Sequence, residues 1–75
     1  MSHSITLETG GTVWKVLVKN GDAVSKGQTL FIMEVMKMEV PYDAPADGTI
    51  ADLDMEEGAV LTEGHKALRL ATSGG

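Results

Sequence analysis

The 75-residue chain has no cysteine, so neither disulfide bonds nor thiolate metal sites can brace its fold. A domain of this size buries only about 60% of the surface that its unfolded chain exposes. Its core must therefore come from aliphatic side chains packed in a compact, regular architecture. No apolar run approaches the roughly 20 residues of a membrane span, and no charged-then-apolar leader opens the chain. We expect one soluble domain over residues 1–75, ordered over about 4–71. We expect no membrane partner and a cytoplasmic location, or an organellar one if the sequence comes from a longer chain.

Basic residues are absent from residues 43–63, although the whole chain carries a formal net charge of −5. That segment holds carboxylates only: Asp43, Asp47, Asp52, Asp54, Glu56, Glu57 and Glu63. An acidic surface repels phosphate backbones, which excludes nucleic acid as a partner. We interpret the segment as a solvated face that keeps the domain soluble.

Catalytic and metal-binding patterns are also missing. Serine, histidine and aspartate occur without a nucleophile elbow, and the run from Gly21 to Gly27 has the wrong spacing for a phosphate loop. His3 and His65 lie far apart in the sequence, and Asp52, Asp54 and Glu56 have the spacing of a solvated strand face. We expect no catalytic residue and no metal site.

An internal repeat organises the chain. A shift of 37 positions, from 11 to 48, superposes glycines and apolar residues of two copies. The coinciding residues are Gly11 and Gly48, Gly21 and Gly58, Gly27 and Gly64, Val16 and Leu53, Val18 and Met55, Val24 and Leu61, and Phe31 and Leu68. Stacked solenoids need at least three copies. Two copies therefore predict one domain with approximate two-fold symmetry, with Lys37 on the connection between the halves.

Residue alternation predicts strands. Trp14, Val16 and Val18 form one alternating set, and Ala51, Leu53 and Met55 form the matching set, which we expect to be the buried faces. Glycines every 6–10 residues, and Pro41 and Pro45, make a long helix improbable. Strands are expected at 4–8, 12–19, 29–35, 38–43, 48–55 and 66–71, with short ones at 23–25 and 60–62. The predicted fold class is all-β, a flattened barrel or sandwich of two packed antiparallel sheets, with Ser2-His3 and Thr72–Gly75 as frayed ends.

The most informative stretch is Val35-Met36-Lys37-Met38-Glu39, in which a lysine stands between two methionines. Strand-forming residues run into and out of it, so we expect Lys37 at a hairpin tip. Tight hairpins need positive φ at both central residues and favour Asn-Gly or Asp-Gly. Met36 and Lys37 in that turn would each cost about 1–3 kcal/mol. Such a turn is typical of a functional position, where a protein presents one primary amine for covalent attachment of a group.

The stretch Glu34–Glu39 resembles the attachment motif of biotin carboxyl carrier domains. Further matches are Gly11-Thr12-Val13-Trp14, the run from Gly21 to Gln28, and Gly48-Thr49-Ile50, so that the resemblance covers about residues 10–71. It implies a flattened barrel of two four-stranded sheets with biotin joined to Nζ of Lys37. Lipoyl domains are similar in fold but usually have Asp-Lys-Ala at the tip.

Three departures from the family pattern stand out. Val35 replaces the alanine that is commoner in bacterial members, and Ala59 and His65 stand where aspartates are frequent. No insertion between Val18 and Leu30 forms a protruding thumb. The chain is therefore similar to thumbless carriers: a domain of a pyruvate-, propionyl- or methylmalonyl-type carboxylase, a decarboxylase domain, or a small separate carrier.

The resemblance implies a non-catalytic carrier that is monomeric as an isolated domain. A biotin protein ligase would load Lys37, and the carrier would then visit a biotin carboxylase and a carboxyltransferase. Met36 and Met38 would offer adaptable contacts to each partner, or simply pack beside the turn. Glu34 and Glu39 would set register with the ligase, or remain solvated strand-edge carboxylates. The alternatives are a lipoyl carrier, and an unmodified all-β interaction module whose hairpin binds a partner directly.

Overall fold

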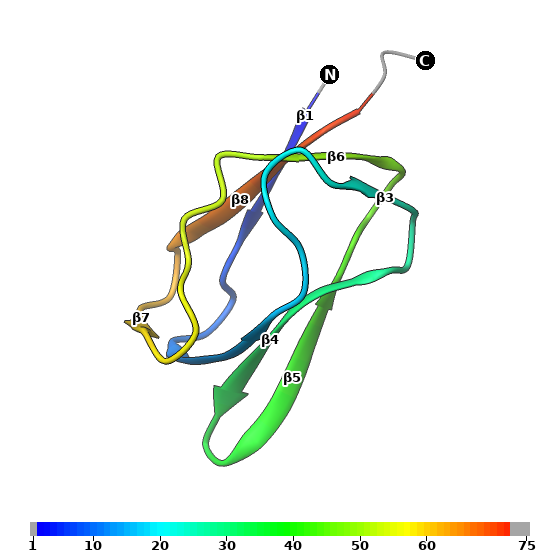
Figure 1. The fold of residues 1–75 in the computed structure, drawn as a ribbon. Coiled ribbons are helices and arrows are strands. Elements are labelled where there is room, and N and C mark those ends of the chain that lie inside the picture. The colour runs from blue at the N-terminus through cyan, green and yellow to red at the C-terminus, as the bar shows by residue number, and fades with distance from the viewer. Residues whose placement is uncertain (1, 73–75) are drawn as a thin grey trace.

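The structure, a computed structural model, describes residues 2–72, which contain eight strands (Figure 1). None of these residues belongs to a helix, so none forms a helix long and apolar enough to cross a membrane. The strands are β1 (Ser2–Thr6), β2 (Gly11–Val16), β3 (Ala23–Val24), β4 (Thr29–Val35), β5 (Met38–Asp43), β6 (Gly48–Ala51), β7 (Val60–Leu61) and β8 (Lys66–Ala71).

The strands form two four-stranded antiparallel sheets, which confirms the predicted fold class. One sheet has the order β1-β8-β6-β3 and the other β5-β4-β2-β7. The 37-residue shift carries β2, β3 and β4 onto β6, β7 and β8, and β1 onto β5. Each sheet is therefore the equivalent of the other under the predicted repeat.

Hydrogen bonds repeat with the same period. The amide of Leu7 donates to the carbonyl of His65 at 3.0 Å, and the equivalent amide of Ala44 donates to that of Gln28 at 2.8 Å. Four glycines with positive φ also form two pairs: Gly21 (93°) with Gly58 (89°), and Gly27 (87°) with Gly64 (86°). These turns require the left-handed region that glycine enters without a steric penalty.

Side chains tie the two halves together in the same symmetric way. The Oε2 atom of Glu57 accepts a hydrogen bond from the amide of Val16 at 3.0 Å. The Oδ1 atom of Asn20 accepts one from the amide of Leu53 at 2.9 Å. Each half thus supplies an acceptor to the backbone of the other, which fixes how the two copies sit against one another.

The core lies between the sheets and is entirely apolar within the described residues. Phe31 stacks on Tyr42 with ring centroids 4.7 Å apart and an interplanar angle of 16°. The buried hydrophobic residues are Leu7, Val13, Val18, Val24, Leu30, Phe31, Met33, Ala44, Ile50, Ala67, Leu68 and Leu70. Aliphatic packing therefore provides the stability that a cysteine-free domain needs.

The predicted buried face of β2 is wrong at Trp14. Its side chain is 43% exposed, whereas Val13 is 1% exposed and belongs to the core. The pairing of β2 with β4 shifts register between Val13 and Lys15, which makes Trp14 the extra residue of a β-bulge. The bulge moves the alternation by one position, and the Nζ atom of Lys15 lies 5.8 Å from the centroid of the exposed indole ring.

The second half departs from the prediction in a similar way. Ile50 is buried, whereas Ala51, Leu53 and Met55 are only half-buried. Regular pairing of β6 ends at Ala51, and Asp52 has a φ of 52°. The strand predicted at 48–55 is therefore shorter, because the chain turns out of the sheet at Asp52.

The chain ends also differ from the prediction. Ser2 and His3 are not frayed: they pair with Ala71 and Leu70 as part of β1. The strand expected at 4–8 lies at Ser2–Thr6, because β8 offers a complete edge to which these residues bond. Thr72 follows β8 outside any strand, and Ser73–Gly75 lie outside the described residues.

An ion pair holds the turn at Asp52. The Nε atom of Arg69 donates to Oδ2 of Asp52 at 2.8 Å. This hydrogen bond and the positive charge of Arg69 hold the pKa of Asp52 below the ordinary value of 3.8. Because the pKa is lowered in the folded state, the stabilisation is present above pH 3.8 and is lost as the pH falls through the folded-state pKa.

We predict that Leu70→Ala lowers the free energy of unfolding by about 2–5 kcal/mol, because Leu70 is fully buried and its truncation leaves a cavity. Leu17→Ala is the matched control, since the same truncation at a side chain that is 51% exposed should cost less than about 1 kcal/mol. Urea unfolding of both variants measures the difference. Equal losses would contradict the assignment of the core.

Candidate functional site

The hairpin of β4 and β5 ends in a two-residue turn. Val35 and Met38 are the last paired residues, which leaves Met36 and Lys37 as the turn. Their φ angles are 51° and 66°, the positive values at both central positions that a type I′ turn requires. The structure therefore places Lys37 at a hairpin tip, as the sequence predicts.

Left-handed backbone at this turn is unfavourable for both residues. Methionine and lysine carry a Cβ atom that crowds the backbone in this region, at a cost of about 1–3 kcal/mol each. Six pairs between Thr29–Val35 and Met38–Asp43 fix the register on either side of the turn. The paired strands determine the turn geometry even though its residues do not favour it.

The base of the hairpin is held by close packing against β2. A Cβ atom at Gly11 would lie 2.5 Å from the carbonyl oxygen of Glu34, so only glycine allows this approach. One residue further, Met33 is fully buried in the core. The hairpin is thus rigidly anchored two to three residues below its tip.

Above that base the side chains leave the core. Met36 is 90% exposed and Met38 is 68% exposed, and Lys37 is exposed between them. Two large apolar side chains in water at a tip add nothing to folding, since they bury little surface. They are available as adaptable contacts for whatever approaches the lysine.

Glu34 and Glu39 form a directly opposed pair across the hairpin. Both are exposed, and their neighbours Met33 and Val40 have the opposite orientation toward the core. Like charges facing one another across strands are slightly destabilising. All five residues predicted from the sequence therefore lie together in one hairpin, the lysine at its tip and the carboxylates two or three positions below.

The 37-residue repeat gives this tip no second copy. The pair Ser2 and Ala71 is the equivalent of the pair Glu39 and Glu34. β1 begins at Ser2 and β8 ends at Ala71, and this end of the strand pair lies away from the hairpin (Figure 1). The fold thus presents a single lysine tip.

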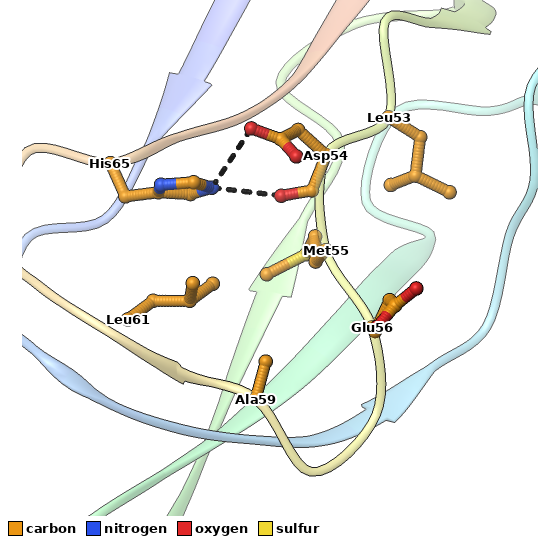
Figure 2. A pocket seen from close by; sticks show the side chains of 7 residues that line it. All are labelled: Leu53, Asp54, Met55, Glu56, Ala59, Leu61 and His65. Atoms are coloured by element: carbon orange, nitrogen blue, oxygen red, sulfur yellow. Dashed lines mark hydrogen bonds and ion pairs between the residues drawn. The ribbon is translucent and has the colours of Figure 1, made fainter.

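A shallow pocket elsewhere was not anticipated from the sequence. Figure 2 shows its lining residues, which are Leu53, Asp54, Met55, Glu56, Ala59, Leu61 and His65. They come from separate turns and from β7, so no local motif signals the pocket. Ala59 and His65, the two departures from the family pattern in the second half, both belong to this lining.

Comparison with known proteins gives consistent matches. The sequence model of a family named for biotin and lipoyl groups, and described as biotin-requiring enzyme, matches residues 1–70. A biotin/lipoyl attachment protein of Bacillus subtilis is 39% identical over 70 residues, covering 93% of this chain and 96% of that protein. The biotin carboxyl carrier protein of acetyl-CoA carboxylase from Solanum lycopersicum is 41% identical over 56 residues, covering 75% of this chain and 80% of that protein.

The structural comparison supports the same fold. A single-chain, multi-domain long-chain acyl-CoA carboxylase matches with a TM-score of 0.88 at 23% identity, covering 97% of this chain. This chain spans only 7% of that carboxylase. The match therefore shows that nearly the whole chain has the fold of one small part of a large protein.

We predict that Met36→Asn raises the free energy of unfolding by about 0.5–1 kcal/mol, because asparagine tolerates left-handed backbone better than methionine. Met38→Asn is the control. It removes another exposed methionine side chain, at the start of β5 and outside the turn, and should give no gain. Urea unfolding compares the two variants, and equal effects would mean that side-chain exposure rather than backbone strain governs the tip.

Proposed function

Because this chain belongs to the biotin/lipoyl attachment family and is a biotin carboxyl carrier, we propose that Lys37 is the residue that bears the biotin. The observation that carries the proposal is the left-handed turn of two non-glycine residues, Met36 and Lys37. A turn selected for stability alone would favour asparagine or glycine there. A lysine with left-handed backbone at the exposed tip of the hairpin supports a role for its amine.

The other lysines occupy less suitable positions. Lys15 lies beside the Trp14 ring, and Lys66 begins the strand β8. Lys19 and Lys26 lie in turns whose backbone amides are bonded to Asp22 and to Asp47, respectively. Lys37 alone is bracketed by exposed methionines at the end of a hairpin, which a modifying enzyme can enclose from several sides.

The residues of the tip fit the attachment chemistry. In the ligase reaction the Nζ atom of Lys37 attacks the acyl carbon of the biotinyl adenylate, forms an amide and expels AMP, and the amine loses a proton. When bound, biotin supplies a ureido nitrogen that accepts and releases a carboxyl group. The domain itself contributes no catalytic group to that transfer. It positions the attachment point on a rigid hairpin.

Partner recognition follows from the exposure of the tip. We assign biotin protein ligase as the enzyme that modifies Lys37, and a biotin carboxylase and a carboxyltransferase as the sites visited afterwards. Met36 and Met38 can repack against each of these surfaces in turn, as flexible thioether side chains do. Glu34 and Glu39 offer two carboxylates at a fixed distance from the lysine, suited to basic groups on the ligase. A tether between domains would keep the effective concentration near millimolar.

The second candidate function is a lipoyl carrier on the same fold. It is favoured by the name of the Bacillus subtilis relative, which mentions both groups. Expression with a biotin ligase or with a lipoyl ligase, followed by intact mass, separates the two. A mass increase with the lipoyl ligase alone would overturn the biotin assignment, and no increase with either would favour an unmodified interaction module.

We predict that Lys37→Arg abolishes biotinylation and leaves the fold intact, because arginine keeps the positive charge but is not a usable acyl acceptor. Co-expression with a biotin ligase, intact mass and peptide mapping measure the modification. Lys15→Arg and Lys66→Arg are the controls and should be fully modified. Biotin mapped to any other lysine would contradict the proposal.

We also predict that the biotinylated protein migrates faster toward the anode on a native gel. Acylation removes one positive charge, so the formal net charge of −5 becomes −6. Circular dichroism should change little, since the exposed tip does not contribute to the core. A large change in the sheet signal would show that the hairpin is reorganised by modification rather than preformed.

A further inference from the structure

The pocket of Figure 2 is lined by a mixture of apolar and polar groups, with two acidic residues among them. Its volume is about 360 Å³, and Leu53, Met55, Ala59 and Leu61 supply apolar side chains. Asp54 and Glu56 stand on the loop that borders it, and the ring of His65 closes the other side. The pocket is large enough for one apolar side chain of a protein partner.

The internal repeat provides a control for this pocket. Its equivalent in the first half would be lined by Val18 and Val24, which are only 7% and 5% exposed. The corresponding Met55 and Leu61 are half-buried. The two halves share strands and backbone hydrogen bonds, so the opening is a property of the second half and not a requirement of the fold.

One cause of the difference is that the second half has Ala59 at the position where the first half has Asp22. In the first half, Oδ2 of Asp22 accepts a hydrogen bond from the amide of Lys19 at 3.0 Å, within the turn that follows Val18. The backbone turn is the same in the second half, where the amide of Ala59 donates to the carbonyl of Glu56 at 3.1 Å. Alanine has no carboxylate to tie the loop or to fill the space.

A second cause is that the second half has His65 at the position where the first half has Gln28. The Oε1 atom of Gln28 accepts a hydrogen bond from the amide of Ser25 at 3.1 Å, within its own turn. The Nε2 atom of His65 instead lies 2.8 Å from the carbonyl oxygen of Asp54 and 3.5 Å from its Oδ2 atom. The imidazole bridges to the opposite loop and forms a wall of the pocket.

The charge around the pocket selects a basic partner. Asp54 and Glu56 line it, and no lysine or arginine occurs in residues 43–63. Asp52 pairs with Arg69, and Glu57 accepts a hydrogen bond from the amide of Val16. Oδ2 of Asp54 lies 3.5 Å from Nε2 of His65, so Glu56 is the lining carboxylate most open to a basic partner. The position equivalent to Glu56 in the first half is Lys19, so this negative charge is likewise confined to the second half.

The pocket lies at the same end of the molecule as the lysine tip. Leu61 pairs with Gly11 and Val60 with Thr12, which itself pairs with Glu34 of the hairpin. β7 is therefore two strands from β4 in the sheet, about 10 Å at ordinary strand spacing. A protein that encloses the tip can reach the pocket without crossing the molecule.

We propose that this pocket is a docking site for a partner protein segment that presents one apolar side chain flanked by lysine or arginine residues. The apolar side chain covers Met55 and Leu61, and the basic residues lie against Asp54 and Glu56. The surface is distinct from the hairpin tip, and binding there does not require modification of Lys37.

The test is a titration of the ¹⁵N-labelled Lys37→Arg chain, followed by NMR, with the peptide acetyl-Lys-Leu-Lys-amide as probe. The expected result is saturable shifts at Met55, Ala59, Leu61 and His65. The repeat equivalents Val18, Asp22, Val24 and Gln28 should not shift. The matched peptides acetyl-Lys-Ala-Lys-amide and acetyl-Glu-Leu-Glu-amide should each bind at least about five-fold more weakly, through loss of apolar contact or of charge attraction.

Two variants with matched controls sharpen the test. Ala59→Asn restores an acceptor for the amide of Glu56 and fills the pocket, and Glu56→Lys reverses the charge of a lining residue. Each should weaken the probe about five-fold or more. Asp22→Ala and Lys19→Glu, the reverse exchanges at the equivalent positions of the first half, should leave the affinity measured from the shifts of Met55 and Leu61 unchanged. If Ala59→Asn fails to fold, Glu56→Lys alone decides.

Three results would overturn the proposal. The first is the absence of saturable shifts with the leucine peptide. The second is that the alanine peptide binds as tightly as the leucine peptide, or that the pocket variants bind the leucine peptide as tightly as the first-half variants do. The third is a shift of the same pocket residues with protein concentration alone, which would make a second copy of the chain the occupant. None of these results bears on whether Lys37 is biotinylated, because the titrated chain has arginine at that position.

Discussion

Apolar packing between two equivalent sheets is the interaction on which the structure depends. Without cysteine, the domain relies on side chains such as Phe31, Leu68 and Leu70, which are fully removed from water. The same packing fixes Met33 at the base of the β4–β5 hairpin. Strain at Met36 and Lys37 persists because the strands that flank them are already held in register by this core. The Lys37 amine thus owes its position to residues that lie well away from it.

Symmetry explains how much of the fold could be predicted. Glycine spacing and the 37-residue repeat indicated both sheets, because the turns that need positive φ at Gly21 and Gly58 recur at equivalent positions of the two halves. Alternation failed at Trp14, since one extra residue in a bulge inverts every face assignment before it. Ser2 and His3 were missed because the edge that orders them, β8, lies at the other end of the sequence.

The candidate site was predictable for a different reason. Its residues are consecutive, so the hairpin tip could be read from a local pattern of methionine, lysine and methionine. The pocket near His65 could not, because it depends on how far two loops stand apart. The sequence indicates only that Ala59 and His65 are unusual. The structure adds that their equivalents, Asp22 and Gln28, bond within their own turns, whereas His65 bonds across to the opposite loop.

The pairing of β1 with β8 brings the first and last strands together at the end of the domain opposite the hairpin. Its longest dimension is 38 Å, and the hairpin and the paired chain ends lie at opposite ends of the ribbon (Figure 1). A connection made at Ser2 or Ala71 would therefore act at a pivot remote from Lys37, with a stiff sheet between them. Rotation about such a pivot moves the amine along an arc whose radius is close to the length of the domain. The folded domain is itself a rigid lever arm, and its length adds to that of any flexible segment on either side.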